Sequence, residues 1–475
     1  RPADDAASEL ACLWHWNCVL EEVDLRRFPN LFPQPPRRPD YTWRREMGRT
    51  LHELRGTLAE GDLDCEAVAD SEACQEESGR WQDLKNLESD YRRLLGRQMD
   101  LHDAKRQAAR APVLPPGINR VVMLGVPDLP VLIQRALEKL VADGVPVEVV
   151  IFGPEGEKKL FDDWGRPEPE CWATRELPLV DEQLSARLDE VAQANEIVSR
   201  LIPYSRNRPS HVAVGVADTT VTPHLERALA DADIPCFNPD GRLLRHAPMV
   251  AFLKALQVLL QQRSFNHADA LLRLPDAWGW ACGQVDEFSS TRFLKGLDEI
   301  RTNHLPVNLD DAAQLFFEGE HIGNRRHARA VLRQLEKALD RIEQTPLSEG
   351  LVEFLQGAFA GRTFTEGREE DAADLESARQ FMARLAEWES VLDGQERPPA
   401  AEALTLLLEV VERESIFPER HQEAVDIQGW LELAWEDAPH LIVAGANEGH
   451  LPESIHGDRF LPEKLRERLG LRTNG

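Results

Sequence analysis

Hydrophobic residues recur three or four positions apart over much of the chain, and in a few places they form short continuous runs. The first helical pattern lies between Trp81 and Leu95, within a tryptophan-bearing stretch that predicts a helical domain over residues 1–112. Prolines and a glycine at 111–117 predict a linker after this domain. The chain therefore begins with a helical part that a linker separates from the remaining residues.

The apolar runs after the linker predict two α/β units. Runs at 120–125 and 147–152 flank an amphipathic segment at 131–142, and strand, helix, strand with short connections indicates a parallel βαβ unit. The second unit repeats this order of strand, helix and strand at 211–216, 222–231 and 234–237. We therefore expect an α/β protein built from parallel sheets.

A long helical region follows the second unit, beginning with a helix at 249–261. It contains two apolar stripes that we interpret as core faces, formed by Ala328, Val331, Leu332, Leu335, Leu339 and Ile342 and by Leu375, Ala378, Phe381, Met382, Leu385, Trp388 and Leu392. Strands return at 425–427 and 440–444. The helical region is therefore predicted to be inserted into the second α/β domain.

The last strand runs directly into a polar loop, Gly445-Ala446-Asn447-Glu448-Gly449-His450-Leu451-Pro452. A buried strand that ends in a sharp loop is how α/β proteins present backbone groups to a ligand. A plain turn is the alternative.

Composition limits the class of protein. With 475 residues, 42% hydrophobic and 29% charged, the chain is long enough for two or more domains and is not disordered as a whole. It contains no apolar run of about 18 residues that would span a membrane. The seven cysteines form no CxxC pair, which predicts reduced thiols in a cytoplasmic protein. Because Arg1 stands in place of Met, we expect a fragment or a processed product.

The net charge of −28 weighs against a protein that coats DNA with its whole surface, so any nucleic-acid contact must be local. There are two candidate basic patches. The first consists of Arg200, Arg206 and Arg208 around Tyr204, and the second is the run Arg325, Arg326, Arg329 and Arg333 with His327. A solvated face or a salt-bridge network is the alternative for both.

Signatures of catalysis are mostly absent from the sequence. No Gly-Lys dipeptide occurs, and the nearest approach to a phosphate loop, Gly357–Thr363, carries Arg362 in place of lysine and follows a helical segment. Trp14-His15-Trp16-Asn17-Cys18 has too few ligands for a zinc site and predicts a packed aromatic helix. We predict neither a catalytic residue nor a metal ligand in this chain.

One pattern imitates a metal-dependent nuclease. Pro127-Asp128 followed by Glu157-Lys158-Lys159 has the residue types of a Pro-Asp…Glu-x-Lys site, in which two carboxylates hold Mg²⁺. A helix and a strand intervene between the two halves, whereas that chemistry needs them on adjoining strands. Glu157 is better explained as a favourable charge in a first helical turn.

Residues 210–261 resemble the start of the second motor domain of UvrD/RecB-type superfamily 1 helicases. The resemblance rests on the order of these elements. A strand at His211–Val216 is followed by a Leu-Glu-x-x-Leu type helix at Leu225–Leu229 and an Ile-Pro strand at Asp233–Phe237. A glycine turn at Gly241–Leu244 and a helix at Met249–Leu260 complete the order. The Gly-x-Asn-Glu-Gly-x-x-Pro loop at 445–452 is similar to that of AddB-type subunits. Residues 458–471, 161–167 and 81–91 extend the likeness over nearly the whole chain, with its strongest part at 425–474.

The resemblance implies a subunit of an AddAB-type helicase-nuclease, a PD-(D/E)XK nuclease family protein that processes DNA double-strand breaks for recombination. It implies a fragment without the N-terminal phosphate loop and the C-terminal nuclease domain. In active helicases a Thr-x-His-x-x-Lys-Gly-Leu-Glu motif couples nucleotide to DNA, whereas the aligned stretch 428–436 has neither histidine nor lysine. The arginine that active motors keep is replaced by Ala217-Asp218, and the strand ending at Asp128 lacks the paired acids that hold Mg²⁺ with ATP.

We therefore expect a helicase-like α/β fold of RecA-like parallel-sheet domains, the first incomplete, with large helical insertions. The expected division begins with a helical 1B-like domain at residues 1–112 and a partial first motor-like domain at 113–175. The first part of the second motor-like domain follows at 176–261, then a 2B-like helical insertion at 262–420. The return segment of the second motor-like domain occupies 421–475. The expected function is to bind or guide DNA beside an AddA-type partner without hydrolysing ATP. ATP and Mg²⁺ would belong to the intact protein or to the partner.

The candidate nucleic-acid contacts are Gly445, Asn447, Gly449, Arg206, Arg208, Arg325 and Arg326. Because Glu448 repels phosphate, we expect Glu448 and Pro452 to structure the loop instead. Two alternatives remain: an ATP-driven motor whose phosphate loop lies upstream of this fragment, and a helical protein-interaction scaffold, which the charge of −28 favours.

Overall fold

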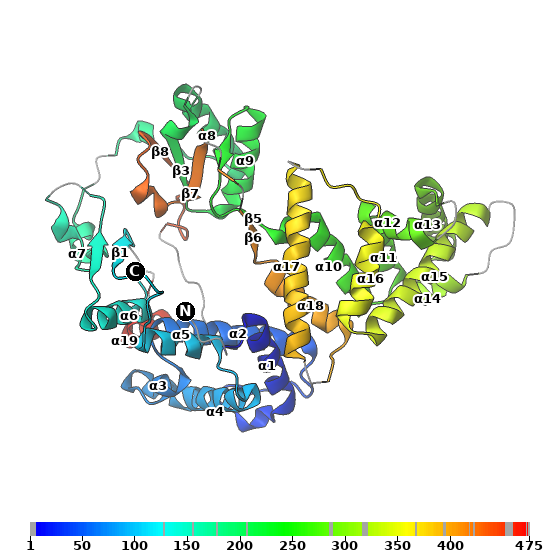
Figure 1. Ribbon diagram of the computed structural model, residues 1–475, viewed down its shortest axis with the longest axis horizontal. Helices are drawn as coiled ribbons and strands as arrows, with labels where there is room; N and C mark the ends of the chain where they lie inside the picture. The colour runs from blue at the N-terminus through cyan, green and yellow to red at the C-terminus, as the bar shows by residue number, and fades with distance from the viewer. Residues whose placement is uncertain are drawn as a thin grey trace. The chain divides into compact units, whose positions relative to one another are not determined.

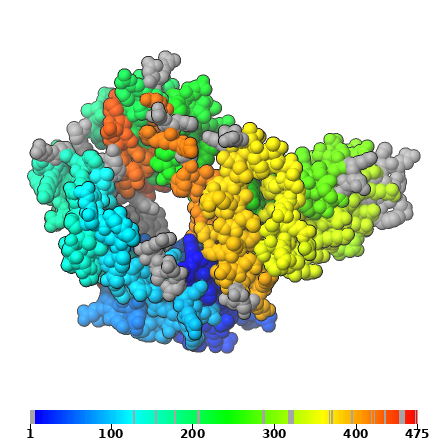
Figure 2. Space-filling model, viewed as in Figure 1, coloured from blue at the N-terminus to red at the C-terminus, as the bar shows by residue number. Residues whose placement is uncertain are grey.

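The computed structural model shows a mixed α/β protein in two compact units. It describes residues 6–126, 129–153, 156–176, 179–205, 208–284, 288–315, 322–365, 368–392, 396–417, 419–420, 423–451, 459–471 and 473. Unit 1 comprises residues 1–8, 15–241 and 417–475, and unit 2 comprises 9–14 and 242–416. Figures 1 and 2 colour the chain by residue number, so that most of unit 2 runs from green to orange. Helix α1 (Glu9–Glu22) contributes residues to both units.

The N-terminal part of unit 1 is helical, as the sequence predicts. It contains α2 (Tyr41–Glu60), α3 (Cys65–Ala69), α4 (Ser78–Leu95) and α5 (Leu101–Arg110). Asp40, Asp64 and Asp100 cap α2, α3 and α5 by accepting hydrogen bonds from the backbone of the first turn. The apolar face of α4 is buried and includes Trp81 and Tyr91, and the ring of Tyr91 stacks on Trp16 at 4.0 Å. The aromatic segment around Trp16 is thus packed.

The predicted βαβ unit is confirmed (Figure 1). Strands β1 (Val121–Leu124) and β2 (Val147–Val150) are parallel neighbours, with Val121 opposite Val147, and α6 (Val131–Ala142) connects them. Leu137 and Leu140 of α6 pack against Met123, because the apolar side of this amphipathic helix must be covered. The short helices η3 (Lys158–Leu160) and α7 (Pro169–Ala173) come next along the chain.

A four-stranded parallel sheet forms the centre of the second α/β part of unit 1, with the order β4-β7-β3-β8. The strands are β3 (Val212–Val216), β4 (Cys236–Phe237), β7 (Val425–Gly429) and β8 (His440–Ala444). Both neighbours of β3 come from beyond the helical region, which confirms that this region is inserted into an α/β domain.

The two faces of this sheet are covered differently. Helices α8 (Glu190–Ser205) and α9 (Thr222–Asp231) cover the face that carries Val212, Val214 and Val216. On the other face, Leu433 of the short helix η8 (Glu432–Trp435) lies over Gly215, where a Cβ atom would come within 2.3 Å of Leu433. Leu441 and Val443 of β8 are each 49% exposed on this second face. The sheet is therefore fully covered on one side only.

In its described residues, unit 2 has β structure only in a short antiparallel pair, β5 (Arg242–Leu243) and β6 (Ser415–Ile416), and in an isolated bridge between Ser264 and Asn308. Its helices are α10 (Pro248–Gln261), α11 (Phe265–Leu272), α12 (Pro275–Gln284), α13 (Ser290–His304), α14 (Leu309–Gln314), α15 (Ile322–Gln344), α16 (Leu347–Phe359), α17 (Glu369–Val391) and α18 (Ala400–Val411).

The two stripes predicted as core faces differ in outcome. All six residues of the stripe on α15 are buried. On α17, Phe381, Leu385 and Trp388 are buried, but Leu375 and Met382 are 51% and 43% exposed, so the prediction is wrong for these two. The buried face of α17 also includes Asp371, Asp374 and Ser377, so it does not coincide with the apolar stripe. Isolated apolar residues are common on protein surfaces.

The C-terminal end of the described chain packs on the helical part of unit 1. Helix α19 (Glu463–Leu469) contacts η2 (Glu72–Glu77), and Leu471 lies against Gly61. The residues predicted as the return segment of a motor-like domain thus contribute β7 and β8 to the sheet and their last helix to the helical part. No helix in the described part of the chain is long and apolar enough to cross a membrane.

Candidate functional site

The polar loop after β8 lies at the carboxyl edge of the four-stranded sheet, beside the end of β3. The two strands are parallel, with Val216 opposite Ala444, and the N–H of Ala217 donates to the carbonyl of Ala444 at 2.9 Å. The loops that begin at Ala217 and Gly445 therefore start side by side. Ligands of open α/β sheets bind outside the carboxyl ends of the strands, so this edge is the first candidate site.

The glycine at the start of the loop is required by a close backbone approach. Gly445 has φ +70°, and a Cβ atom there would lie 2.6 Å from the Cβ of Asp218. The N–H of Asn447 donates to the carbonyl of Gly445, and the N–H groups of His450 and Leu451 donate to the carbonyl of Asn447. Gly449 also has a positive φ, +88°. The loop is thus a tight turn fixed by its own backbone.

Asp218 dominates the electrostatics of this edge. One carboxylate oxygen accepts hydrogen bonds from Thr220, from the N–H at 2.9 Å and from the hydroxyl at 2.6 Å. The other lies 3.7 Å from Nε2 of His450. Burial raises the pKa of Asp218, but the hydrogen bonds from Thr220 and the charge of His450 outweigh it, so that the pKa is below its ordinary value. At neutral pH this carboxylate is charged, and it fixes the start of the loop after β3 through Thr220. It pairs with His450 of the other loop only when that imidazole is protonated.

Asn447 and Glu448 are exposed at the tip of the loop. Among the described residues, neither side chain has a hydrogen-bond partner, so Asn447 is available to a ligand. For the same reason, the loop-structuring role predicted for Glu448 has no hydrogen bond to support it in the described part of the loop. Pro452 lies outside the described residues.

The structure does not bring the first basic patch to this edge. Arg208 immediately precedes η5 (Pro209–His211) and β3, so it lies at the amino edge of the sheet, about 17 Å from the carboxyl edge at the rise of a five-residue strand. The ring of Tyr204 packs on that of His440 with the centroids 3.8 Å apart and a tilt of 33°, also at the amino edge, and Arg200 pairs with Glu196. Arg206 lies outside the described residues.

Arg325 and Arg326 belong to unit 2, on α15. Arg325 faces Glu299 at 3.5 Å, which is the salt-bridge alternative considered from the sequence. Arg326 is exposed. The predicted nucleic-acid residues therefore fall into three separate places: the carboxyl edge of the sheet, its amino edge, and α15.

The two sequence patterns that imitate catalytic sites have other contacts. Arg362, at the lysine position of the phosphate-loop imitation, is bound by Asp276, Asp371 and Asp374, whose carboxylates would repel a phosphate. Glu157 precedes η3 and pairs with Arg175 at 2.7 Å; this hydrogen bond lowers the pKa of Glu157. Pro127 and Asp128 lie outside the described residues.

Cys18, the cysteine of the predicted aromatic helix, is a poor metal ligand. Burial, reinforced by the charges of Glu21 and Glu22, raises the pKa of its thiol to about 12. Metals bind the thiolate, so a thiol that stays protonated at neutral pH does not favour coordination.

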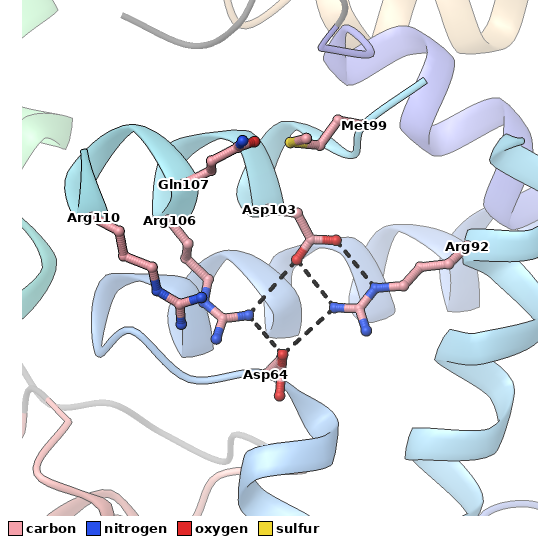
Figure 3. A pocket seen from close by; sticks show the side chains of 7 residues that line it. All are labelled: Asp64, Arg92, Met99, Asp103, Arg106, Gln107 and Arg110. Carbon is pink, nitrogen blue, oxygen red and sulfur yellow. Dashed lines mark hydrogen bonds and ion pairs between the residues drawn. The ribbon is translucent and has the colours of Figure 1, made fainter. Parts of the chain in front are cut away.

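A network of charged side chains in the helical part of unit 1 was not predicted from the sequence (Figure 3). Asp64 and Asp103 alternate with Arg92 and Arg106 in a closed ring of ion pairs, in which Arg106 reaches Asp64 at 2.7 Å and Arg92 reaches Asp103 at 3.1 Å. The ring lines a cavity of about 560 Å³ together with Met99, Gln107 and Arg110. The ring joins α3, α4 and α5.

Arg55 of α2 extends the network into the interior. It is 4% exposed and lies 2.6 Å from both Glu88 and Asp100 and 2.8 Å from Asp103. Burial alone would lower the pKa of Arg55, but these carboxylates raise it well above its ordinary value. Beside them, burial lowers the pKa of His52 to about 3 and that of His102 to about 4, so both imidazoles are neutral at pH 7.

The charges of the extended network balance. Its cations are Arg55, Arg92, Arg106, Arg110 and Arg135, and its carboxylates are Asp62, Asp64, Glu88, Asp100 and Asp103. Because the charges compensate each other, we interpret the network as holding the helices together and not as a ligand site. The only signal in the sequence is the position of Asp64 and Asp100 directly before helices, where aspartates act as N-caps.

No protein-family model matches this sequence, and no curated protein matches it at a significant level.

Proposed function

We propose that this chain is the helicase-like core of an AddB-type subunit of a helicase-nuclease. Its α/β parts would be RecA-like domains, and the chain would guide DNA in double-strand break repair, in the cytoplasm and beside an AddA-type subunit. ATP hydrolysis would be left to the partner or to parts of the intact protein outside this chain. Two features support the proposal: the parallel sheet assembled from both sides of a helical insertion, and the motif residues of its last loop.

The observation that carries the proposed DNA contact is the position of Asn447. It is exposed at the tip of a backbone-fixed loop at the carboxyl edge of a parallel sheet. A pre-formed loop loses little conformational entropy when it binds a ligand.

The charges of this edge indicate which part of DNA it contacts. Asp218 and Glu448 carry negative charge close to Asn447, which disfavours a phosphate at the tip of the loop. The amide of Asn447 both donates and accepts hydrogen bonds, as the edge of a base requires. We therefore assign the loop to the bases of a single strand.

The test is the binding of a labelled single-stranded oligonucleotide at low salt, measured by fluorescence anisotropy for the wild type, Asn447→Ala and Asn303→Ala. Asn303 is an exposed residue of α13 in unit 2 and serves as the matched control. We expect Asn447→Ala to weaken binding about five-fold, the equivalent of roughly 1 kcal/mol for a lost hydrogen bond. Asn303→Ala should bind as the wild type does. Equal binding by all three proteins would remove the loop as a contact.

One observation favours a second function, that of a protein-interaction scaffold. Leu441 and Val443 are half exposed on the outer face of β8, and parallel sheets are usually covered on both faces. If the chain binds no single-stranded DNA at low salt, either alone or with a partner subunit, the DNA function fails and the scaffold is preferred.

A further inference from the structure

We propose that Arg326, Arg329 and Arg333, on one face of α15, form a track that binds consecutive phosphates of a nucleic-acid strand. The proposal rests on the proposed function for the kind of ligand, but it uses a surface of unit 2 and not the sheet edge of unit 1. The acidic surroundings of Asn447 disfavour phosphate contacts at the loop, and this proposal places the phosphate contacts on α15 instead.

The spacing of the three arginines places them on one side of the helix. Positions 326, 329 and 333 are three and four residues apart, which is the repeat of a helical face. This face lies opposite Asn324 and Ala328, which meet Gly296 of α13 in a close approach of the two helices. From Arg326 to Arg333 the track is about 10 Å long, and one strand of duplex DNA carries a phosphate about every 3.4 Å along the axis. The length is therefore suited to about three phosphates.

Two of the arginines are anchored by backbone carbonyls. Arg333 donates from Nε to the carbonyl of Ala313 at 2.8 Å, and Arg329 donates to the carbonyl of Leu315. These acceptors are neutral backbone groups at the end of α14. Arg325, by contrast, faces the carboxylate of Glu299. The carbonyl acceptor of Arg333 does not neutralise its charge, and its guanidinium group has further N–H groups for an anion.

Repulsion within the track supports this assignment. Burial, Arg333 and Arg326 together lower the pKa of Arg329. Arginines elsewhere in unit 2, such as Arg362 and Arg384, have raised pKa values because carboxylates surround them. A phosphate bound between Arg326, Arg329 and Arg333 would relieve the repulsion, and it would meet side chains that are already positioned.

The track ends one turn beyond Arg333. Burial, Asp310 and Asp340 raise the pKa of Glu336, which marks an acidic neighbourhood. A strand that tracked along the arginines would have to leave the helix there.

The experiment compares wild type, Arg326→Glu, Arg326→Glu with Arg333→Glu, and Lys295→Glu, using anisotropy with a labelled duplex and a labelled single strand over a series of salt concentrations. Arg326 is exposed and makes no hydrogen bond or ion pair with a described residue, so Arg326→Glu tests the track even if loss of the Arg333 anchor disturbs α14. The control residue Lys295 is exposed on α13, next to Gly296, which meets the side of α15 opposite the track. Lys295→Glu changes the charge by the same amount as Arg326→Glu.

We expect Arg326→Glu to weaken binding of both probes about ten-fold at low salt, as for a lost charge-assisted hydrogen bond. The slope of log K against log salt should become shallower by about one for each phosphate contact removed. Lys295→Glu should change neither quantity. Wild-type affinity and slope in Arg326→Glu, or an equal loss in Lys295→Glu, would overturn the proposal.

Asn447→Ala, measured beside these variants, separates the two proposals. If Asn447→Ala loses affinity and Arg326→Glu does not, the track is wrong and the loop contact stands. If Arg326→Glu loses affinity and Asn447→Ala does not, the track stands and the loop contact is wrong.

Discussion

The buried charge of Arg55 gives the most demanding prediction for stability. In Arg55→Met, Asp103 keeps its contacts with Arg92 and Arg106, and Glu88 keeps Arg92 at 3.5 Å. Asp100 loses its ion pair with Arg55 but keeps the hydroxyl of Tyr91 at 2.6 Å and the backbone N–H of His102 at 2.8 Å. The carboxylate of Asp100 is 0% exposed and that of Glu88 is 2% exposed. Removing one partner of a buried ion pair costs about 3–5 kcal/mol, because the other charge stays buried without compensation.

This cost is large beside the stability of a typical domain, about 5–15 kcal/mol. Because the chain has two units, its unfolding as a whole is not a two-state transition, so a local measurement is needed. Hydrogen exchange followed by mass spectrometry reports on α2, α4 and α5 separately. We expect protection there to fall by roughly a hundred-fold to a few thousand-fold, at ten-fold per 1.4 kcal/mol.

The pH dependence checks the mechanism. Without Arg55, the pKa of Glu88 in the folded state, which burial already raises, rises further, and the pKa of Asp100 rises from its lowered value. The folded variant then binds more protons than the unfolded chain in mildly acidic solution, so the destabilisation is full at about pH 7.5 and shrinks towards about pH 5. Replacing Asp100 by Asn as well should restore part of the protection, because asparagine also caps helices.

Arg49→Met on the same helix is the matched control, because Arg49 and Glu53 are exposed and 3.9 Å apart. We expect it to cost less than about 1 kcal/mol. A loss in Arg55→Met of less than about 1 kcal/mol, or one that is the same at both pH values, would refute the interpretation of a buried, uncompensated carboxylate.

Two further predictions concern the histidines beside Arg55 and the loop after β8. Because the pKa values of His52 and His102 are lowered, the folded state binds fewer protons than the unfolded chain between about pH 6.5 and pH 4. Hydrogen-exchange protection of α2 and α5 should therefore fall as the pH falls through this range, by up to about 1.4 kcal/mol per pH unit for each histidine. In His102→Gln this dependence on pH should be shallower. Gly445→Ala places a Cβ atom against Asp218 at a positive φ and should reduce protection of the loop by about 1–3 kcal/mol. The control is Gly361→Ala, whose Cβ atom enters open space, and it should be nearly neutral. Equal effects of the two substitutions would contradict the close approach of Gly445 to Asp218.

Much of the secondary structure can be predicted from the order of apolar and polar residues. The pattern predicted α6 at the residues it occupies and predicted β1, β2, β3 and β7 to within a few positions at their ends. It did so because each helix or strand must bury one face, and that requirement is local to the segment. Predicting burial of individual residues was less reliable, as Leu375 and Met382 show, because an apolar side chain stays exposed where no neighbouring element covers it.

The candidate sites depended on the tertiary structure. Gly445 lies against Asp218, and Arg208 lies at the opposite edge of the same sheet, because β8 pairs with β3 in a parallel register. The ring of Asp64, Arg92, Asp103 and Arg106 likewise needs three helices in place before any of its ion pairs exists. The sequence by itself determined which segments are helices and strands, and where a polar loop follows a buried strand. Only the tertiary structure decided which charges meet, because ion pairs and close approaches join residues that no local pattern relates.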